Sequence, residues 1–353
     1  MKKLSIILLT IILITFAVLG FKFYGKTKDK DNNDILIGLS LDSLVIERWE
    51  LDRDLFVSRA KELGADVIVQ NANKDTDEQI SQIKYLIDKN VDVLVIVPHD
   101  GEALTNVVES ARKKGIKVIS YDRLIKNSNV DLYISFDNEK VGEIMANSLV
   151  EKKPKGKYII INGAKEDYNT HMVNEGIYNI LNSYIENGDI KILNEVWAEG
   201  WREEDAYNVI DEALKQGNEI DGIIGGDDRL AEAAIQALSE RRLAGEVFVV
   251  GQDAELAACQ RIVEGFQLMT IYKPIKVLAQ EAADIAVNMA KGEKFLANSE
   301  IYDGKYYIPF QIEEPIPVYK DNMLDVIVDD NFHRIDQIYM NVPKAEWPEE
   351  NKD

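Results

Sequence analysis

Polar residues recur at one kind of place in this sequence, directly after short runs of Val, Ile and Leu. The runs alternate with helical patterns, so we expect parallel strands whose carboxyl ends share the edge where ligands bind. Carboxylates, amides and arginine suit vicinal hydroxyls, because each hydroxyl both donates and accepts a hydrogen bond. Trp49, Trp197 and Trp201 are suited to stack on the apolar face of a ring. The polar residues are Asp42, Asn71, His99, Asp122, Arg123, Asp137, Asn138, Asn162, Asp227, Asp228, Gln252 and Asp253.

The alternative is that each polar residue only caps the helix that follows it. Capping accounts for the position of any single residue better than for the positions of the whole set. No catalytic motif offers another explanation. The histidines are isolated, and the sequence has no zinc-protease, phosphate-loop or G-x-S-x-G pattern. The adjacent acids Asp227 and Asp228 make a poor glycosidase pair, because sequence neighbours at a strand end usually diverge. We therefore expect a binding protein that is not an enzyme and uses no cofactor or metal.

The charge balance excludes one class of partner. Acidic residues outnumber basic ones by 62 to 41, which gives a net charge of -21. A surface this negative repels phosphate backbones, so we expect no nucleic-acid binding. Cys259 is the single cysteine, which rules out an internal disulfide and a thiolate metal cluster.

The first residues predict attachment to a membrane. Residues 4–21 form an apolar run long enough to span a bilayer as a short or tilted helix. The alternative is a cleaved signal peptide, but no A-x-A pattern precedes Lys22, and no cysteine is present there to accept a lipid. We predict an uncleaved, single-pass anchor in the cell membrane, a polar linker over 22–34, and an extracytoplasmic domain beyond it.

Two consecutive series of apolar runs predict the fold. Runs rich in Val and Ile, separated by helical patterns, are typical of parallel sheets covered on both faces. Two such series in 353 residues indicate two doubly wound α/β units. The first series comprises 35–41, 66–70, 91–98, 116–122 and 131–136, and the second comprises 157–163, 190–197, 221–226, 246–251 and 268–272.

Several motifs together resemble the type I periplasmic sugar-binding proteins, and among them those that bind D-xylose. The resemblance covers about residues 35–320. It implies two α/β lobes joined by a three-strand hinge, with a sugar enclosed between them. The lobes would comprise 35–137 plus 274–312 and 138–273 plus 313–330. The segment 331–353 departs from the family; because its end is polar we expect a C-terminal tail there, with a partner contact as the alternative. The motifs are ERW (47–49), YDR (121–123), FDNEKVG (136–142), GQDA (251–254) and YKP (272–274).

The resemblance also implies which residues contact the sugar. The tryptophans would pack on the ring, and the charged and amide groups would bind its hydroxyls. One position departs from the family, because Asp227 stands where its members carry asparagine; an ionised carboxylate only accepts hydrogen bonds. The implied residues are Arg48, Trp49, Asp122, Arg123, Asp137, Asn138, Asn169, Trp201, Asp227, Asp253 and Lys273.

The resemblance leaves two partners open. Members of the family close around a sugar by a hinge motion and deliver it to the permease of an ABC-type transporter. Membrane-tethered members present the closed state to a sensor histidine kinase instead. Because a predicted anchor replaces the usual signal peptide or lipid site, we favour a sugar receptor for a sensor kinase, with transport as the alternative.

Overall fold

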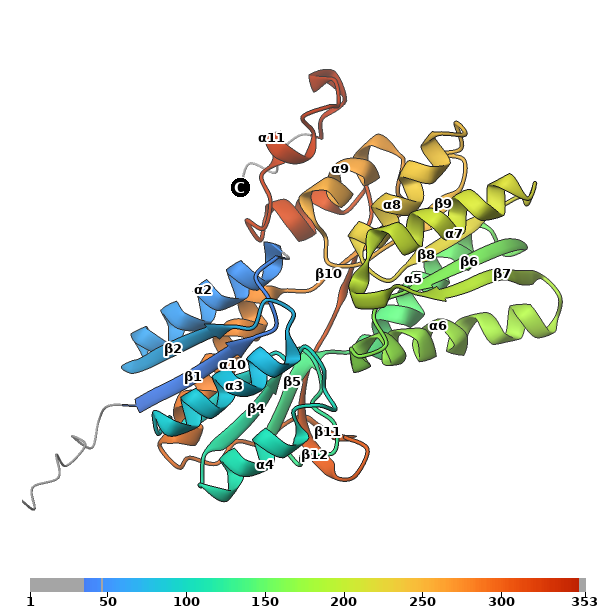
Figure 1. Cartoon of the computed structure of the whole chain (residues 1–353). Coiled ribbons are helices and arrows are strands. Elements are labelled where there is room, and N and C mark those ends of the chain that lie inside the picture. The colour runs from blue at the N-terminus through green and yellow to red at the C-terminus, as the bar shows by residue number, and fades with distance from the viewer. Residues whose placement is uncertain (1–34, 46, 349–353) are drawn as a thin grey trace, which may run out of the picture.

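The computed structural model describes residues 35–45 and 47–348, which form two α/β lobes side by side (Figure 1). The predicted anchor and linker, 4–21 and 22–34, lie outside these ranges. Within the described ranges, no helix is both long and apolar enough to cross a membrane. The predicted α/β fold with two parallel sheets is confirmed.

The N-terminal lobe contains a seven-stranded sheet in the order β11-β12-β5-β4-β3-β1-β2. All neighbours are parallel except the edge pair β11 and β12. The strands are β1 (Ile35–Leu41), β2 (Ala65–Asn71), β3 (Val93–Ile96), β4 (Lys117–Tyr121), β5 (Leu132–Phe136), β11 (Ser299–Tyr302) and β12 (Tyr307–Glu313).

Helices cover both faces of this sheet because its strands are apolar on both sides. Alternate residues of β3 illustrate the pattern: Val93 and Val95 pack with α2 and α10, whereas Leu94 and Ile96 pack with α3 and α4. The helices are α2 (Glu47–Glu62), α3 (Thr76–Asp88), α4 (Thr105–Lys113) and α10 (Ile275–Ala290).

The C-terminal lobe repeats this plan around a parallel sheet in the order β7-β6-β8-β9. One face packs with α5 and α6 and the other with α7 and α8. The strands are β6 (Gly156–Asn162), β7 (Ile190–Trp197), β8 (Gly222–Gly225) and β9 (Phe248–Val250). The helices are α5 (Asn138–Lys152), α6 (Tyr168–Glu186), η1 (Glu199–Trp201), α7 (Glu203–Lys215), α8 (Asp228–Ser239) and α9 (Leu256–Glu264).

The chain passes between the lobes three times. It leaves the first sheet after β5, returns between β10 (Thr270–Tyr272) and α10, and leaves again between β12 and β13 (Ile316–Val318). Strands β10 and β13 form an antiparallel pair beside the second lobe. Because the crossings lie next to the carboxyl ends of β5 and β10, residues of both lobes meet there.

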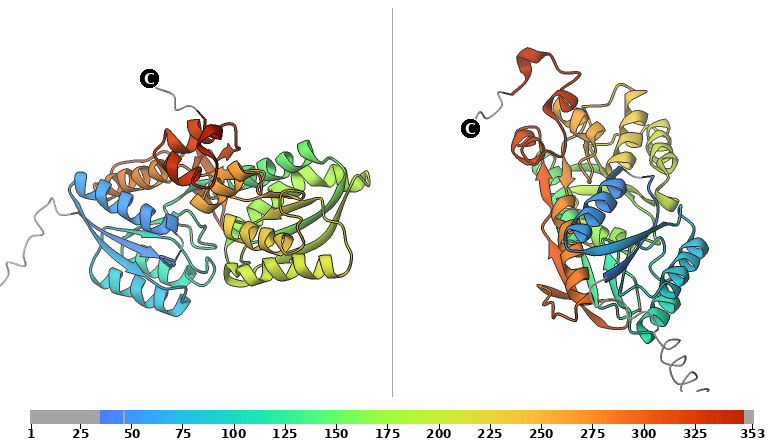
Figure 2. Two further views of the ribbon diagram at one scale, coloured as in Figure 1. Left: turned by 90° about the horizontal axis from the view of Figure 1, so that it is seen from above. Right: turned by 90° about the vertical axis from the view of Figure 1, so that its left-hand side faces the viewer.

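The C-terminal segment packs against the protein instead of extending as a tail. We define residues 321–348 as the C-terminal extension; it contains η2 (Leu324–Val328), α11 (Ile335–Ile338) and η3 (Lys344–Glu346). Its apolar side chains, including the buried Ile338 and Tyr339, form a cluster with α9. The prediction of a tail over 331–353 is therefore corrected for 331–348. Figure 2 shows the extension above the junction of the two lobes.

Candidate ligand-binding site

A cleft between the lobes collects the strand-end residues of both sheets. Ten of the eleven predicted residues line it. The N-terminal lobe supplies one wall from the start of α2 and the loop after β4, and the C-terminal lobe supplies the other from the ends of β9 and β10 and the starts of α6 and α8. The ten residues are Arg48, Trp49, Asp122, Arg123, Asn138, Asn169, Trp201, Asp227, Asp253 and Lys273.

The structure does not bring the eleventh residue, Asp137, into the cleft. Asp137 is the N-cap of α5, and its Oδ1 accepts a hydrogen bond of 2.9 Å from the backbone N–H of Lys140. This is the capping role that sequence alone also allowed for it. Its neighbour Asn138 lines the cleft and is held by a hydrogen bond of 3.1 Å from its Nδ2 to the carbonyl of Phe136.

One wall of the cleft is built around Arg48 and Trp49. The guanidinium of Arg48 lies 4.4 Å from the centre of the Trp49 ring. It forms ion pairs of 2.7 Å with Asp122 and 3.4 Å with Asp52. These partners compensate the burial of the arginine, so the wall presents a fixed cation beside an aromatic face.

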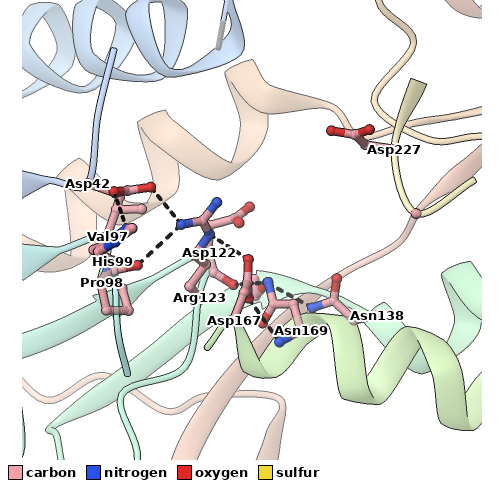
Figure 3. A network of polar contacts seen from close by, with 12 residues as sticks. Asp42, Val97, Pro98, His99, Asp122, Arg123, Asn138, Asp167, Asn169 and Asp227 are labelled. Atoms are coloured by element: carbon pink, nitrogen blue, oxygen red, sulfur yellow. Dashed lines mark hydrogen bonds and ion pairs between the residues drawn. The ribbon is translucent and has the colours of Figure 1, made fainter. Parts of the chain in front are cut away.

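A second network, drawn in Figure 3, joins the two lobes through Arg123. Its Nη1 contacts Asp42 at 2.8 Å within the N-terminal lobe, and its Nε contacts Asp167 of the C-terminal lobe at 2.7 Å. His99 Nδ1 extends the network by its contact of 2.8 Å with Asp42. Asn169 also crosses the cleft, donating from Nδ2 to the carbonyl of Asp122 at 2.8 Å. The lobes are therefore in direct polar contact, as expected of a closed cleft.

The opposite wall carries two carboxylates with different partners. Burial alone would raise the pKa of Asp253, but Lys273 at 3.0 Å and Arg48 at 3.5 Å hold that pKa below its ordinary value. Asp227 accepts hydrogen bonds from the backbone N–H of Leu230 at 2.7 Å and from Arg229 at 2.9 Å. Burial raises the pKa of Asp227, and Arg229 opposes this shift. Arg229 thus explains how a carboxylate is accommodated at this position.

Several polar atoms in the cleft have no hydrogen-bond partner among the described residues. Buried polar groups are normally paired, so these atoms are available to a ligand. They are Trp49 Nε1, Thr170 Oγ1, Trp201 Nε1 and Gln252 Oε1.

Backbone strain is concentrated in the same place. Asp122, Trp201 and Asp253 have φ angles of 61°, 63° and 96°, in the left-handed region that residues with side chains rarely adopt. Gly163 makes room for the indole of Trp201, because a Cβ there would lie 2.2 Å from the ring. Strain of this kind persists where surrounding contacts enforce a functional geometry.

The set predicted from the sequence missed four polar residues of the cleft. Asn162 and Gln252 follow strands, so the strand-end pattern had already singled them out. Asp167 is the N-cap of α6, and Thr170 lies in the first turn of that helix. The feature of the sequence that could have identified Asp167 is its position. Like Asp227, it directly precedes a helix and caps it.

Comparison with known proteins decides the family. A model of the periplasmic binding protein domain matches residues 37–294. The chain belongs to the periplasmic binding protein family. It is 47% identical over 309 residues to the D-xylose-binding periplasmic protein of Haemophilus influenzae, covering 87% of this chain and 93% of that protein. It is 43% identical to the D-xylose-binding periplasmic protein of Escherichia coli, covering 85% and 92%.

A solved structure of this family has the same architecture. The solute-binding protein of an ABC transporter from Clostridium phytofermentans, with bound β-D-glucose, superimposes with a TM-score of 0.79 at 27% identity. The match covers 86% of this chain and 99% of that one. Membership in the periplasmic binding protein family confirms the predicted resemblance, and with it the prediction of a binding protein that is not an enzyme.

The contact between His99 and Asp42 predicts a pH-dependent contribution to stability. The hydrogen bond to Asp42 raises the pKa of His99 above its usual value, although partial burial opposes the shift. The contribution is therefore complete below the unfolded-state pKa of about 6.5 and is lost as the pH rises through the higher folded-state pKa. We expect His99→Gln to lower the melting temperature most near pH 5.5 and least near pH 8, measured by circular dichroism. A difference that stays constant over this range would contradict the ion pair.

Proposed function

We propose that the protein is an extracytoplasmic receptor that binds D-xylose by closing its two lobes around the sugar. The observation that supports this most directly is the composition of the cleft. Arg48, Asp122 and Arg123 come from one lobe, and Asn169, Asp253 and Lys273 come from the other. Trp49 and Trp201 add aromatic surface, and their indole N–H groups have no hydrogen-bond partner in the part of the chain that the structure describes. The likeness to two D-xylose-binding periplasmic proteins points to D-xylose as the sugar.

Closure follows from the distribution of these contacts between the lobes. A sugar that touches only one wall gains part of its hydrogen bonds, whereas a closed cleft supplies all of them. The ligand therefore favours the closed state by its extra contacts there. A micromolar dissociation constant corresponds to about -8 kcal/mol, which charge-assisted hydrogen bonds and ring stacking supply after the costs of binding are met.

The proposal includes attachment to the membrane through residues 4–21, with a sensor histidine kinase as the partner that recognises the closed state. The sequence supports anchoring over lipid attachment, because Cys259 is the single cysteine and is fully buried. Delivery to the permease of an ABC transporter is the second candidate. It is favoured by the likeness to the transporter-associated protein of Clostridium phytofermentans.

The sugar is tested by calorimetric titration of the full-length chain in detergent. We expect a micromolar dissociation constant for D-xylose and at least tenfold weaker binding of L-arabinose, D-ribose and D-glucose. The discrimination arises because a missing or inverted hydroxyl leaves buried polar groups of the cleft unpaired. Equal affinities for the four sugars would contradict selectivity for D-xylose. The absence of binding heat with all four sugars would contradict a pentose as the ligand.

The position of the cleft is tested by a matched pair of aspartate variants. Asp253→Ala leaves Lys273 with a buried, uncompensated charge, so we expect sugar affinity to fall about 100-fold or more. Asp137→Ala removes only a helix cap, so we expect a loss of about 1 kcal/mol in unfolding free energy and an unchanged dissociation constant. Calorimetry and urea denaturation measure the two quantities. Equal affinities of the two variants would refute the placement of the site.

The two candidate partners differ in what deletion of the gene does to cells. If the protein serves a sensor kinase, deletion abolishes the rise in transcription of D-xylose-use genes when D-xylose is added. Uptake of labelled D-xylose then continues when those genes are expressed from an independent promoter. If it serves a transporter, uptake fails under the independent promoter. Failed uptake would contradict the sensor-kinase role and support delivery to the permease.

A further inference from the structure

The C-terminal extension contacts the two backbone segments that carry the Asp253–Lys273 ion pair. Asp253 and the following Ala254 both have positive φ angles, 96° and 52°. Residues with side chains rarely adopt such a conformation, so neighbouring contacts must hold the turn in place. The turn carries one of the charged groups of the cleft, and its geometry fixes where that carboxylate lies.

Three backbone N–H groups of the turn are held by the C-terminal lobe itself. The N–H of Asp253 donates to the carbonyl of Ile271 at 2.8 Å, and that of Ala254 donates to Thr270 Oγ1 at 3.1 Å. The N–H of Glu255 donates to Asp228 at 3.1 Å. The carbonyl of Ala254 accepts a weak hydrogen bond of 3.6 Å from Cys259 Sγ within the lobe and a shorter one of 2.9 Å from His333 Nε2 of the extension.

The same short segment also holds the strand that ends at Lys273. Tyr272, the residue before Lys273, donates its phenol O–H to the carboxylate of Asp330. Its ring packs against Phe332, with ring centres 4.9 Å apart. Phe332 in turn packs against His333, with centres 4.4 Å apart. Residues 330–333 thus contact both elements that carry the Asp253–Lys273 ion pair.

From these contacts we propose that residues 330–333 act as a clamp that positions the Asp253–Lys273 pair for ligand binding, with His333 as the central positioning residue. The inference rests on the proposed function of the cleft. His333 does not line that cleft; it acts through the carbonyl of Ala254. The clamp lies at the junction of the lobes, since Phe332 and His333 border a second groove together with Glu50 and Leu51 of α2.

Calorimetry on the full-length chain with D-xylose tests the clamp. We expect His333→Ala to weaken binding about tenfold, because the turn relaxes and Asp253 leaves its place. His333→Gln keeps an N–H donor in reach of the Ala254 carbonyl, so affinity returns to within about twofold of the wild type. Asn341→Ala is the matched control: it removes a side-chain hydrogen bond of 2.8 Å from the same extension to Glu264, which lies at the end of α9 away from the turn. Its affinity stays unchanged.

A second measurement needs no sugar. Hydrogen exchange at the backbone amides of Ala254 and Glu255 becomes faster in His333→Ala than in the wild type or in Asn341→Ala. Unchanged exchange there, or a loss of affinity that His333→Gln does not restore or that Asn341→Ala shares, would overturn the clamp. If the wild type binds none of the sugars, the proposed function fails, while the exchange measurement still decides whether His333 holds the turn.

Discussion

The buried guanidinium of Arg123 is paired with carboxylates from both lobes in this closed arrangement. A buried charge without a partner costs several kcal/mol, so each carboxylate within reach contributes strongly to the arrangement around it. Asp42 is available within the same lobe, but Asp167 reaches Arg123 only when the lobes are together. The end of β4 and the start of α6 must therefore meet, and the three chain crossings are what allow them to do so without unfolding either sheet.

The other charged groups of the cleft are paired with opposite charges in the same way. Positive and negative groups alternate from Asp122 through Arg48 to Asp253 and Lys273. Each group is fixed by its neighbours in the closed cleft, and the strained turns at Asp122 and Asp253 are held by hydrogen bonds of the backbone around them. Such preorganisation lowers the cost of ordering side chains on binding. The indole N–H groups of Trp49 and Trp201, which have no hydrogen-bond partner within 35–45 and 47–348, are instead available to a ligand.

The sequence predicted most of this fold, because runs of Val and Ile that are apolar on both faces have few other stable arrangements. It did not predict β11, β12 or β13: β11 and β13 are short and mostly half-exposed, and β12 begins with alternating exposed and buried residues, so no continuous apolar run marks them. Asp137 and Asn138 show that the sequence did not distinguish the roles of two adjacent residues. Both follow a strand and precede a helix, and only the observed start of α5 assigns the cap to the first and the cleft to the second. The C-terminal extension was expected as a tail because its sequence is mostly polar; a few spaced apolar residues, Phe332, Ile338 and Tyr339 among them, are enough to pack it onto α9.

The pairing of buried charges at Asp227 also bears on selectivity for the ligand. An asparagine there, as the family resemblance implies, offers both a donor and an acceptor, whereas a carboxylate offers acceptors alone. Here one oxygen caps α8 through Leu230 and the other contacts Arg229, so the carboxylate is fixed and its charge is compensated outside the cleft. What remains for a ligand is lone-pair density that accepts from a hydroxyl and cannot donate to one. An aspartate in place of asparagine therefore keeps the shape of the side chain, and any hydroxyl that contacts it must donate, while Arg229 compensates its charge.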